Sequence, residues 1–329
     1  TDLEARTYAE NRFSTYLAQK GLITVFIDST ERSPTFRLFP LDTVSEPTRK
    51  CWIQVWTPAR DKSLAWLSFL GRPFRGLEES FYRPAFEEIV KDPYLQRAAL
   101  ESLKKAGDNQ QDLYDFSFSE FNLKNRGPRP GDLGVVVTLS PEESELLDGS
   151  SPFVQFIKLF LKNQARVVIL SVNDLNEKRT AELERKLQLF YQQDLIEKPK
   201  FLTSVALSIA KENDPFLLKQ NVGLKMLLNA HSTAVMARLG RVIGNTMTNV
   251  SPSNLKLIGR ATYLIQSHVN DCLRQPDWIK KYGQRPPVTY GEANAVLFDS
   301  IAFLKDKQAI AGQTAEVALS IIRILESLR

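Results

Sequence analysis

The stretch "VVVTLSPEESELLDGSSPFVQFIKLFLKNQARVVILSV", residues 135–172, decides the fold of this chain. It begins and ends in two apolar runs, residues 134–139 and 166–172, which are strand-sized and rich in valine, isoleucine and leucine. Between these runs, a glycine, two serines and a proline precede a helical pattern over residues 151–163. A strand, a helix and a second strand in this order predict two parallel strands joined by a helical crossover.

Three further segments have the same strand-like character, namely residues 23–28, 52–56 and 202–209. All five are nearly continuous apolar runs, which is typical of strands that are covered on both faces. A helical pattern over residues 176–193 joins the fourth predicted strand to the fifth. We therefore predict an α/β fold, with a five-stranded parallel sheet flanked by helices in a three-layer sandwich.

The character of the sequence changes after residue 209, where no further strand is predicted. Between the second and third strands the patterns indicate helices over residues 61–70 and 77–105, followed by a loop. After residue 209 they indicate helices over residues 214–247, 251–273, 292–305 and 314–327. The chain is thus expected to divide into an α/β domain, residues 1–210, and an all-helical C-terminal lid, residues 211–329.

Composition limits the class of protein. The chain has 329 residues, 43% of them hydrophobic, so it is long enough to bury a real core. Its net charge of +5 is not concentrated in one block, so no nucleic-acid partner is expected. A net positive protein is suited to small anionic ligands such as sugar phosphates. No apolar run approaches the ~20 residues of a membrane span, so no membrane partner is expected either.

Other features of the sequence concern its compartment and its cofactors. Two distant cysteines, Cys51 and Cys272, favour buried thiols in a reducing cytoplasm. The chain begins at Thr1 without a methionine, so we expect it to be a piece of a longer protein. No glycine pattern for a nucleotide and no cluster of metal ligands occurs, so neither a cofactor nor a metal is predicted.

The turn at Gly149, Ser150 and Ser151 has two interpretations. A helix start leaves backbone N–H groups without partners and carries about half a positive charge from the helix dipole. Ser151 before Pro152 is suited to cap these groups, and the same geometry binds phosphate where a glycine allows close approach. The loop follows a strand, so it lies at the carboxyl edge of the sheet, where ligands of α/β folds bind.

The order of strand, "GSSPF", helix and strand resembles the sugar isomerase (SIS) domain. The loop differs from that family, because the acidic "PEESELLD" (residues 141–148) precedes the glycine. The family's Gly-rich phosphate turn after the first strand also has no counterpart here, since "STERSPTF" (residues 29–36) contains no glycine.

A second resemblance lies in "LKMLLNAHSTAVMARLGRVIGNTMTNVSPSNLKLIGRA", residues 224–261. It is similar to the segment that follows the sugar-phosphate domains in the SIS branch of N-acetylmuramic acid 6-phosphate etherase and the glucokinase regulatory protein. The shared residues are Asn229, Ser232, Thr233, Leu239, Gly240, Arg241, Gly244, Asn245, Ser253, Asn254, Leu255 and Lys256. The resemblance implies a second SIS domain with its lid, an upstream SIS half or second copy as oligomeric partner, and a sugar kinase as a further partner.

The resemblance also implies ligand-binding residues. Arg241 matches a basic position that reaches the sugar phosphate, and Arg238 and Asn245 share its helix face at helical spacing. Ser232 and Thr233 offer hydroxyl groups. The alternatives are a solvated basic helix for the arginines and hydroxyls that bond to a carbonyl of their own helix.

Catalytic residues are not identified by the sequence. The etherase works with glutamates of its other half, and no stretch here matches them. Glu142, Glu143 and Glu145 are expected to face solvent on a turn, and His231 and His268 to be helix-packing or surface residues. We expect a carbohydrate-derivative (sugar phosphate) binding module that is regulatory or non-catalytic. One alternative is that the chain forms part of a sugar-phosphate etherase (lyase) or isomerase. Another is an interaction scaffold whose contact surface is the aromatic loop 114–121 together with the helical tail.

Overall fold

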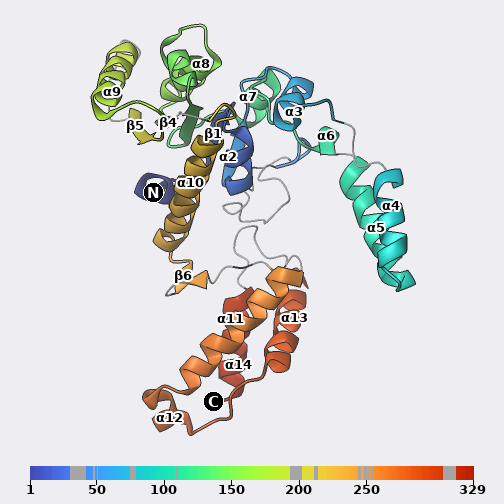
Figure 1. The fold of residues 1–329 in the computed structure, drawn as a ribbon. Helices are drawn as coiled ribbons and strands as arrows, with labels where there is room; N and C mark the ends of the chain where they lie inside the picture. The colour runs from blue at the N-terminus through green and yellow to red at the C-terminus, as the bar shows by residue number, and fades with distance from the viewer. Residues whose placement is uncertain are drawn as a thin grey trace.

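The computed structural model contains one five-stranded, all-parallel sheet with the strand order β2-β1-β3-β4-β5 (Figure 1). It describes residues 1–29, 42–46, 49, 51–74, 79–108, 110–192, 202–210, 214–243, 246, 247, 250, 252, 255–306 and 316–329. The strands are β1 Ser14–Ala18, β2 Ile53–Trp56, β3 Leu133–Leu139, β4 Arg166–Asn173 and β5 Leu202–Ser208. The predicted α/β class is confirmed, and four of the five strands lie where the sequence placed them.

The first predicted strand is wrong. Residues 23–28 belong to helix α2, Leu22–Ser29, and the strand is the preceding segment Ser14–Ala18. A short apolar run is compatible with a strand or with a buried helix, and here the exposed fractions reveal the helix, since Ile23 and Ile27 are 54% and 56% exposed while Val25 and Phe26 are buried. The loop after the first strand is therefore residues 19–21, and it does contain a glycine.

Gly21 allows a close approach between this loop and a later helix. A Cβ atom at Gly21 would come within 2.8 Å of Cδ2 of Leu224, on helix α10, Leu218–Arg238. Leu224 is fully buried and packs in the same core as Val137 and Leu139 of β3. The glycine thus lets α10 lie close to the carboxyl end of β1.

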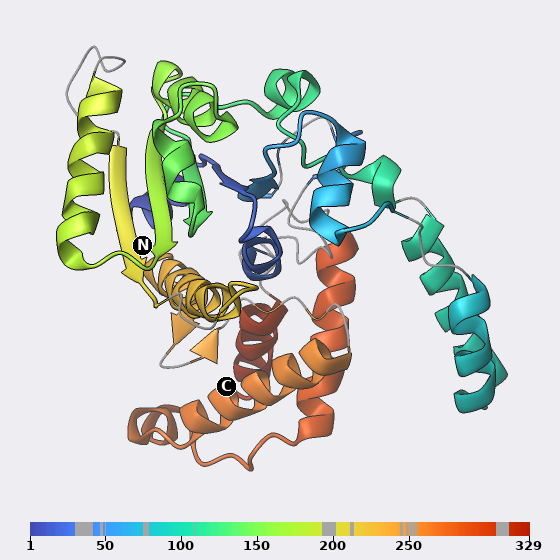
Figure 2. The same ribbon diagram turned by 45° about the horizontal axis from the view of Figure 1, so that its top comes forward.

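Helices cover both faces of the sheet, as Figure 2 shows. Because side chains alternate along a strand, β3 sends Val135 and Val137 into the core below α2 and α10, and Val136 into the opposite core. The opposite core is built by α8, Pro152–Lys162, and α9, Glu177–Gln192, with Phe156 and Phe160 among its fully buried rings. Helix α1, Asp2–Ala9, lies beside α10.

The region between β2 and β3 contains α3 Lys62–Leu70, α4 Glu79–Ile89, α5 Pro93–Asp108, α6 Gln110–Leu113 and α7 Glu120–Arg126. The single helix predicted over residues 77–105 is two helices, which project from the sheet in Figure 1. They separate at Asp92, whose side chain accepts the backbone N–H of Leu95 and caps α5, with Pro93 in its first turn.

The aromatic loop after α6 is part of the core. Phe116 and Phe118 are 0% and 2% exposed, and Tyr114 is also buried. Phe116 packs on Trp66, Phe118 packs on Trp56, and the backbone carbonyl of Tyr114 accepts the ring N–H of Trp66. The scaffold interpretation, which used the loop's aromatic rings as a contact surface, is therefore wrong for these three rings.

The C-terminal part is helical, with the small exception of an antiparallel pair, β6 Val242–Ile243 and β7 Thr246–Met247, which was not predicted. Helix α10 ends at Arg238 rather than running to residue 247, because Gly240 adopts a left-handed conformation with φ of 71°. The last helices are α11 Leu255–Leu273, α12 Pro276–Tyr282, α13 Tyr290–Asp306 and α14 Glu316–Ser327.

Helices α11 to α14 share a core of their own, with Ile265, Leu297 and Val317 among its buried residues. Helix α10, in contrast, packs on the sheet through Leu224 and Leu228. The division of the chain at residue 210 stays a prediction. Within the described ranges, no helix has both the length and the apolar character that a membrane crossing requires.

Candidate functional site

The loops at the carboxyl edge of the sheet are joined by a polar network around Ser140, the residue that follows β3. Its Oγ lies 3.2 Å from Oε1 of Glu143 and 3.3 Å from Oδ1 of Asp174, which follows β4. Its backbone N–H donates to Oε1 of Gln220 on α10 at 3.1 Å. This edge, where α/β folds bind ligands, therefore carries carboxylates close to one another.

Glu142 is the most buried acid of this edge. It is 1% exposed, although the sequence predicts that it faces solvent, because 3-10 helix η1, Glu142–Leu147, turns its side chain inward. Its Oε1 accepts the backbone N–H of Lys20 at 3.0 Å, and its Oε2 accepts that of Leu139 at 2.8 Å. Burial raises the pKa of Glu142 to about 7, against the lowering effect of these two hydrogen bonds.

The turn at Gly149, Ser150 and Ser151 caps α8. The Ser151 hydroxyl accepts the backbone N–H of Phe153 at 3.2 Å, and Pro152 occupies the first turn of the helix. Ser150 donates from its N–H and its hydroxyl to Asp148, at 2.9 and 2.7 Å, and these bonds lower the pKa of Asp148. The capping interpretation is confirmed, and anion binding at this turn stays a prediction.

The predicted ligand residues of the lid segment lie at the other end of the sheet. The guanidinium of Arg241 lies 4.3 Å from the ring centre of Trp52, which precedes β2 and so marks the amino edge. Arg238 pairs with Asp2 at 2.9 Å, and both side chains are exposed. Within one chain, therefore, the arginines and the turn at Gly149 lie at opposite edges.

Two details of the predicted lid site are corrected. Arg241 is not on the helix of Arg238, because α10 ends at Arg238, so these residues do not share a helix face. Asn245 lies outside the described residues. Ser232 is buried, and its hydroxyl donates to the carbonyl of Asn229 at 3.1 Å. This bond within its own helix is the predicted alternative to ligand binding. Thr233 is exposed.

A buried polar cluster that the sequence did not predict lies on the sheet face between α1 and α10. Its centre is Glu4, which is 2% exposed. Oε1 of Glu4 accepts the hydroxyls of Tyr8 at 2.5 Å and Ser14 at 2.9 Å, and Oε2 accepts that of Tyr16 at 2.8 Å and contacts Nε2 of His231. His231 is thus a helix-packing residue, as expected, but its carboxylate partner could not be inferred from any local pattern.

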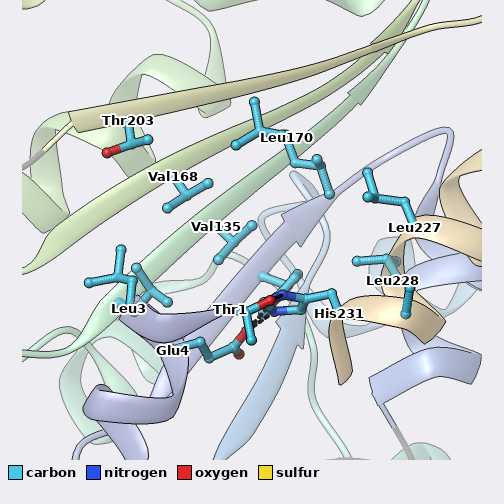
Figure 3. Close-up of a pocket in the computed structure, with 14 residues that line it drawn as sticks. Thr1, Leu3, Glu4, Val135, Val168, Leu170, Thr203, Leu227, Leu228 and His231 are labelled. Carbon is cyan, nitrogen blue, oxygen red and sulfur yellow. Dashed lines mark hydrogen bonds and ion pairs between the residues drawn. The ribbon is translucent and has the colours of Figure 1, made fainter. Parts of the chain in front are cut away.

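Glu4 and His231 form the polar end of a cavity of about 440 Å³, shown in Figure 3. Its walls are apolar side chains of the sheet and of α10, among them Val135, Val168, Leu170, Leu227 and Leu228. The oxygens of Glu4 are already shared by four side-chain partners. We therefore assign this cluster a structural role, joining α1, β1 and α10.

The comparisons with known proteins point to one kind of relative. No protein-family model matches the chain. The N-acetylmuramic acid 6-phosphate etherase of Porphyromonas gingivalis is 50% identical over 50 residues, which cover 15% of this chain and 18% of the etherase. That of Psychromonas ingrahamii is 27% identical over 201 residues, 60% of this chain and 55% of the relative.

A third relative is intermediate in both identity and matched length. The etherase 1 of Enterococcus faecalis is 32% identical over 103 residues, 30% of this chain and 33% of the relative. The chain spans less than a fifth of the length of the Porphyromonas protein and about half of the Psychromonas protein. The chain is therefore similar to N-acetylmuramic acid 6-phosphate etherases, over a short segment at high identity and over much of its length at low identity.

Proposed function

We propose that this chain is a sugar-phosphate-binding module of the SIS type and is itself non-catalytic. The observation that carries the proposal is the similarity to several etherases whose names specify a phosphorylated sugar derivative. The five-stranded parallel sheet with helices on both faces agrees with the SIS resemblance. The non-catalytic role is supported by the carboxyl edge, where Glu142 already holds two backbone N–H groups.

The proposed site needs more than one SIS unit. Arg241 and the Gly149 turn lie at opposite edges of the sheet, so one ligand cannot contact both within a single chain. We therefore propose that Arg241 and the exposed Arg238 serve a pocket completed by an upstream SIS half or by a second copy. A guanidinium suits this role because it offers a planar fork of donors to a phosphate.

Calorimetry with fructose 6-phosphate, fructose 1-phosphate and N-acetylmuramic acid 6-phosphate tests the proposal. We expect binding of at least one of them to the protein with its partner SIS unit present. Arg241→Ala should weaken that binding, whereas Arg274→Ala, which removes an exposed arginine paired with Asp271 on α11, should not. If none of the three sugars binds, the proposal is wrong.

The alternative is that the chain forms part of an etherase, which the names of the relatives favour. Cleavage of an ether next to a carboxylate needs a base for the α proton and an acid for the leaving oxygen, and a carboxyl group whose pKa is near neutral can serve either role. Glu142 has such a pKa, about 7. Release of D-lactate from N-acetylmuramic acid 6-phosphate by the protein with its partner SIS unit, lost in Glu142→Gln, would support the etherase. No release by that complete protein would exclude it.

A further inference from the structure

Two backbone N–H groups, one near the carboxyl end of β1 and one at the carboxyl end of β3, donate hydrogen bonds to the same side chain. These strands are neighbours in the sheet, and Leu139 and Lys20 lie at and just after their ends. Both N–H groups point to the same carboxylate, one to each of its oxygens, at 2.8 and 3.0 Å. Lys20 also lies two residues before α2, whose N-terminal end carries a partial positive charge.

Backbone donors from adjacent loops, together with a helix start, are the means by which parallel sheets hold anions. In this chain the anion is a side chain. We propose that the N–H groups of Lys20 and Leu139 form an anion seat and that Glu142 is its internal occupant, so that a phosphate group can bind there only by displacing Glu142. This inference rests on the proposed function and adds that the place between the ends of β1 and β3 is closed to phosphate in this chain.

The charges around the anion seat strengthen this exclusion. Glu145, on the same turn as Glu142, acts on it through its negative charge, and the side chain of Lys20 supplies the opposing positive charge. From the neighbouring loops, Glu143 and Asp174 both contact Ser140, and Gln220 of α10 is uncharged. A phosphate that entered beside an ionised Glu142 would be repelled by Glu142 itself and by Glu145, while Glu143 and Asp174 lie at Ser140, the residue after Leu139, so the two anions cannot share the anion seat.

Removal of the occupant should therefore create phosphate binding. We would titrate inorganic phosphate into the full chain and into its Glu142→Ala variant by calorimetry, at a pH above the pKa of Glu142. The variant should bind phosphate with a Kd about tenfold or more below that of the unchanged chain, because two backbone donors become available to the ion. The control is Glu145→Ala, which removes the same charge from the same turn but does not free the two donors.

Two outcomes would overturn the proposal, namely no gain in Glu142→Ala, or an equal gain in Glu145→Ala, which would be an effect of net charge alone. If Glu142→Ala does not fold, the unchanged chain supplies the test. The amide signals of Lys20 and Leu139 should then shift together with pH in a nuclear magnetic resonance titration, with one midpoint near the pKa of Glu142. Amides that do not respond to pH would contradict the assignment.

The outcome is separable from that of the proposed function. Sugar phosphates that fail to bind the protein with its partner SIS unit would remove the proposed function, yet leave a phosphate gain in Glu142→Ala intact. If sugar phosphates bind but Glu142→Ala does not bind inorganic phosphate more tightly than the unchanged chain, the proposed function is retained. The proposal that Glu142 occupies an anion seat is then wrong.

Discussion

Glu4 and His231 are 227 residues apart in the sequence and in direct contact in the fold, Oε2 against Nε2. The contact joins α1 to α10 beneath the sheet face, and the hydroxyls of Tyr8, Ser14 and Tyr16 satisfy the rest of the carboxylate. A buried charge held by so many partners is costly to disturb, because each partner removed leaves polar atoms without hydrogen bonds.

Glu4→Ala should destabilise the chain by about 1–3 kcal/mol, because the hydroxyls of Tyr8, Ser14 and Tyr16 lose their shared acceptor. The free energy of unfolding, measured by urea denaturation, checks this value. Glu10→Ala, which removes an exposed glutamate just after the same helix, is the control and should change it by less than about 0.5 kcal/mol. In a double-mutant cycle with His231→Ala, purely additive effects would show that the two residues are not coupled.

Glu142 should make stability depend on pH. Its pKa is about 7 in the folded chain and 4.5 for an ordinary glutamate, so between these values the folded state binds more protons than the unfolded state. The contribution of Glu142 to the free energy of unfolding should therefore be fully present below pH 4.5. It should fall as pH rises to about 7, with a slope approaching about 1.4 kcal/mol per pH unit.

Urea denaturation across this pH range measures the slope, with Glu142→Gln and Glu145→Gln compared with the unchanged chain. The neutral amide at residue 142 should flatten the profile, because it cannot ionise, whereas the change at residue 145 should leave most of the slope. A profile that is as steep in Glu142→Gln as in the unchanged chain would assign the effect to another group.

Ser151→Ala should separate capping from ligand binding. Loss of the hydroxyl that accepts the N–H of Phe153 should cost about 1 kcal/mol of stability, as for other helix N-caps. Ser150→Ala, whose hydroxyl bonds to Asp148 in an exposed turn, should cost less. If Ser151→Ala lowers sugar-phosphate affinity while thermal stability is unchanged, the turn binds the ligand and the cap is unimportant.

Gly21→Ala should destabilise the chain by about 1–3 kcal/mol, because the added methyl group would overlap Leu224 at 2.8 Å in a packed core. Gly149→Ala is the matched control, since no atom of the described residues lies within 4 Å of a Cβ atom built there. Thermal unfolding of both variants measures the difference. A melting temperature of Gly21→Ala equal to that of Gly149→Ala would mean that α10 does not approach the loop so closely.

Much of the fold follows from local patterns in the sequence. Four strands, the helix cap at Ser151 and helices α11, α13 and α14 depend on the spacing of apolar residues and on Ser, Pro and Gly at helix ends. The short helix α12 was not predicted. The strand predicted over residues 23–28 was wrong for a physical reason, because a short run with four apolar residues does not show whether one face or both are buried. Only packing against Leu224 and the sheet decided that this run is a helix.

The candidate site, in contrast, depended on which distant segments meet. The sequence alone determined that a parallel sheet would place the loop of Ser140 and Gly149 at its carboxyl edge, because strand direction follows from the helical crossovers. Only the tertiary structure decided that Glu142 turns inward to the backbone of Lys20, that His231 meets Glu4 and that Arg241 lies on Trp52 at the opposite edge. Such contacts join residues far apart in the chain, and their energies come from burial and from paired donors that no local spacing records.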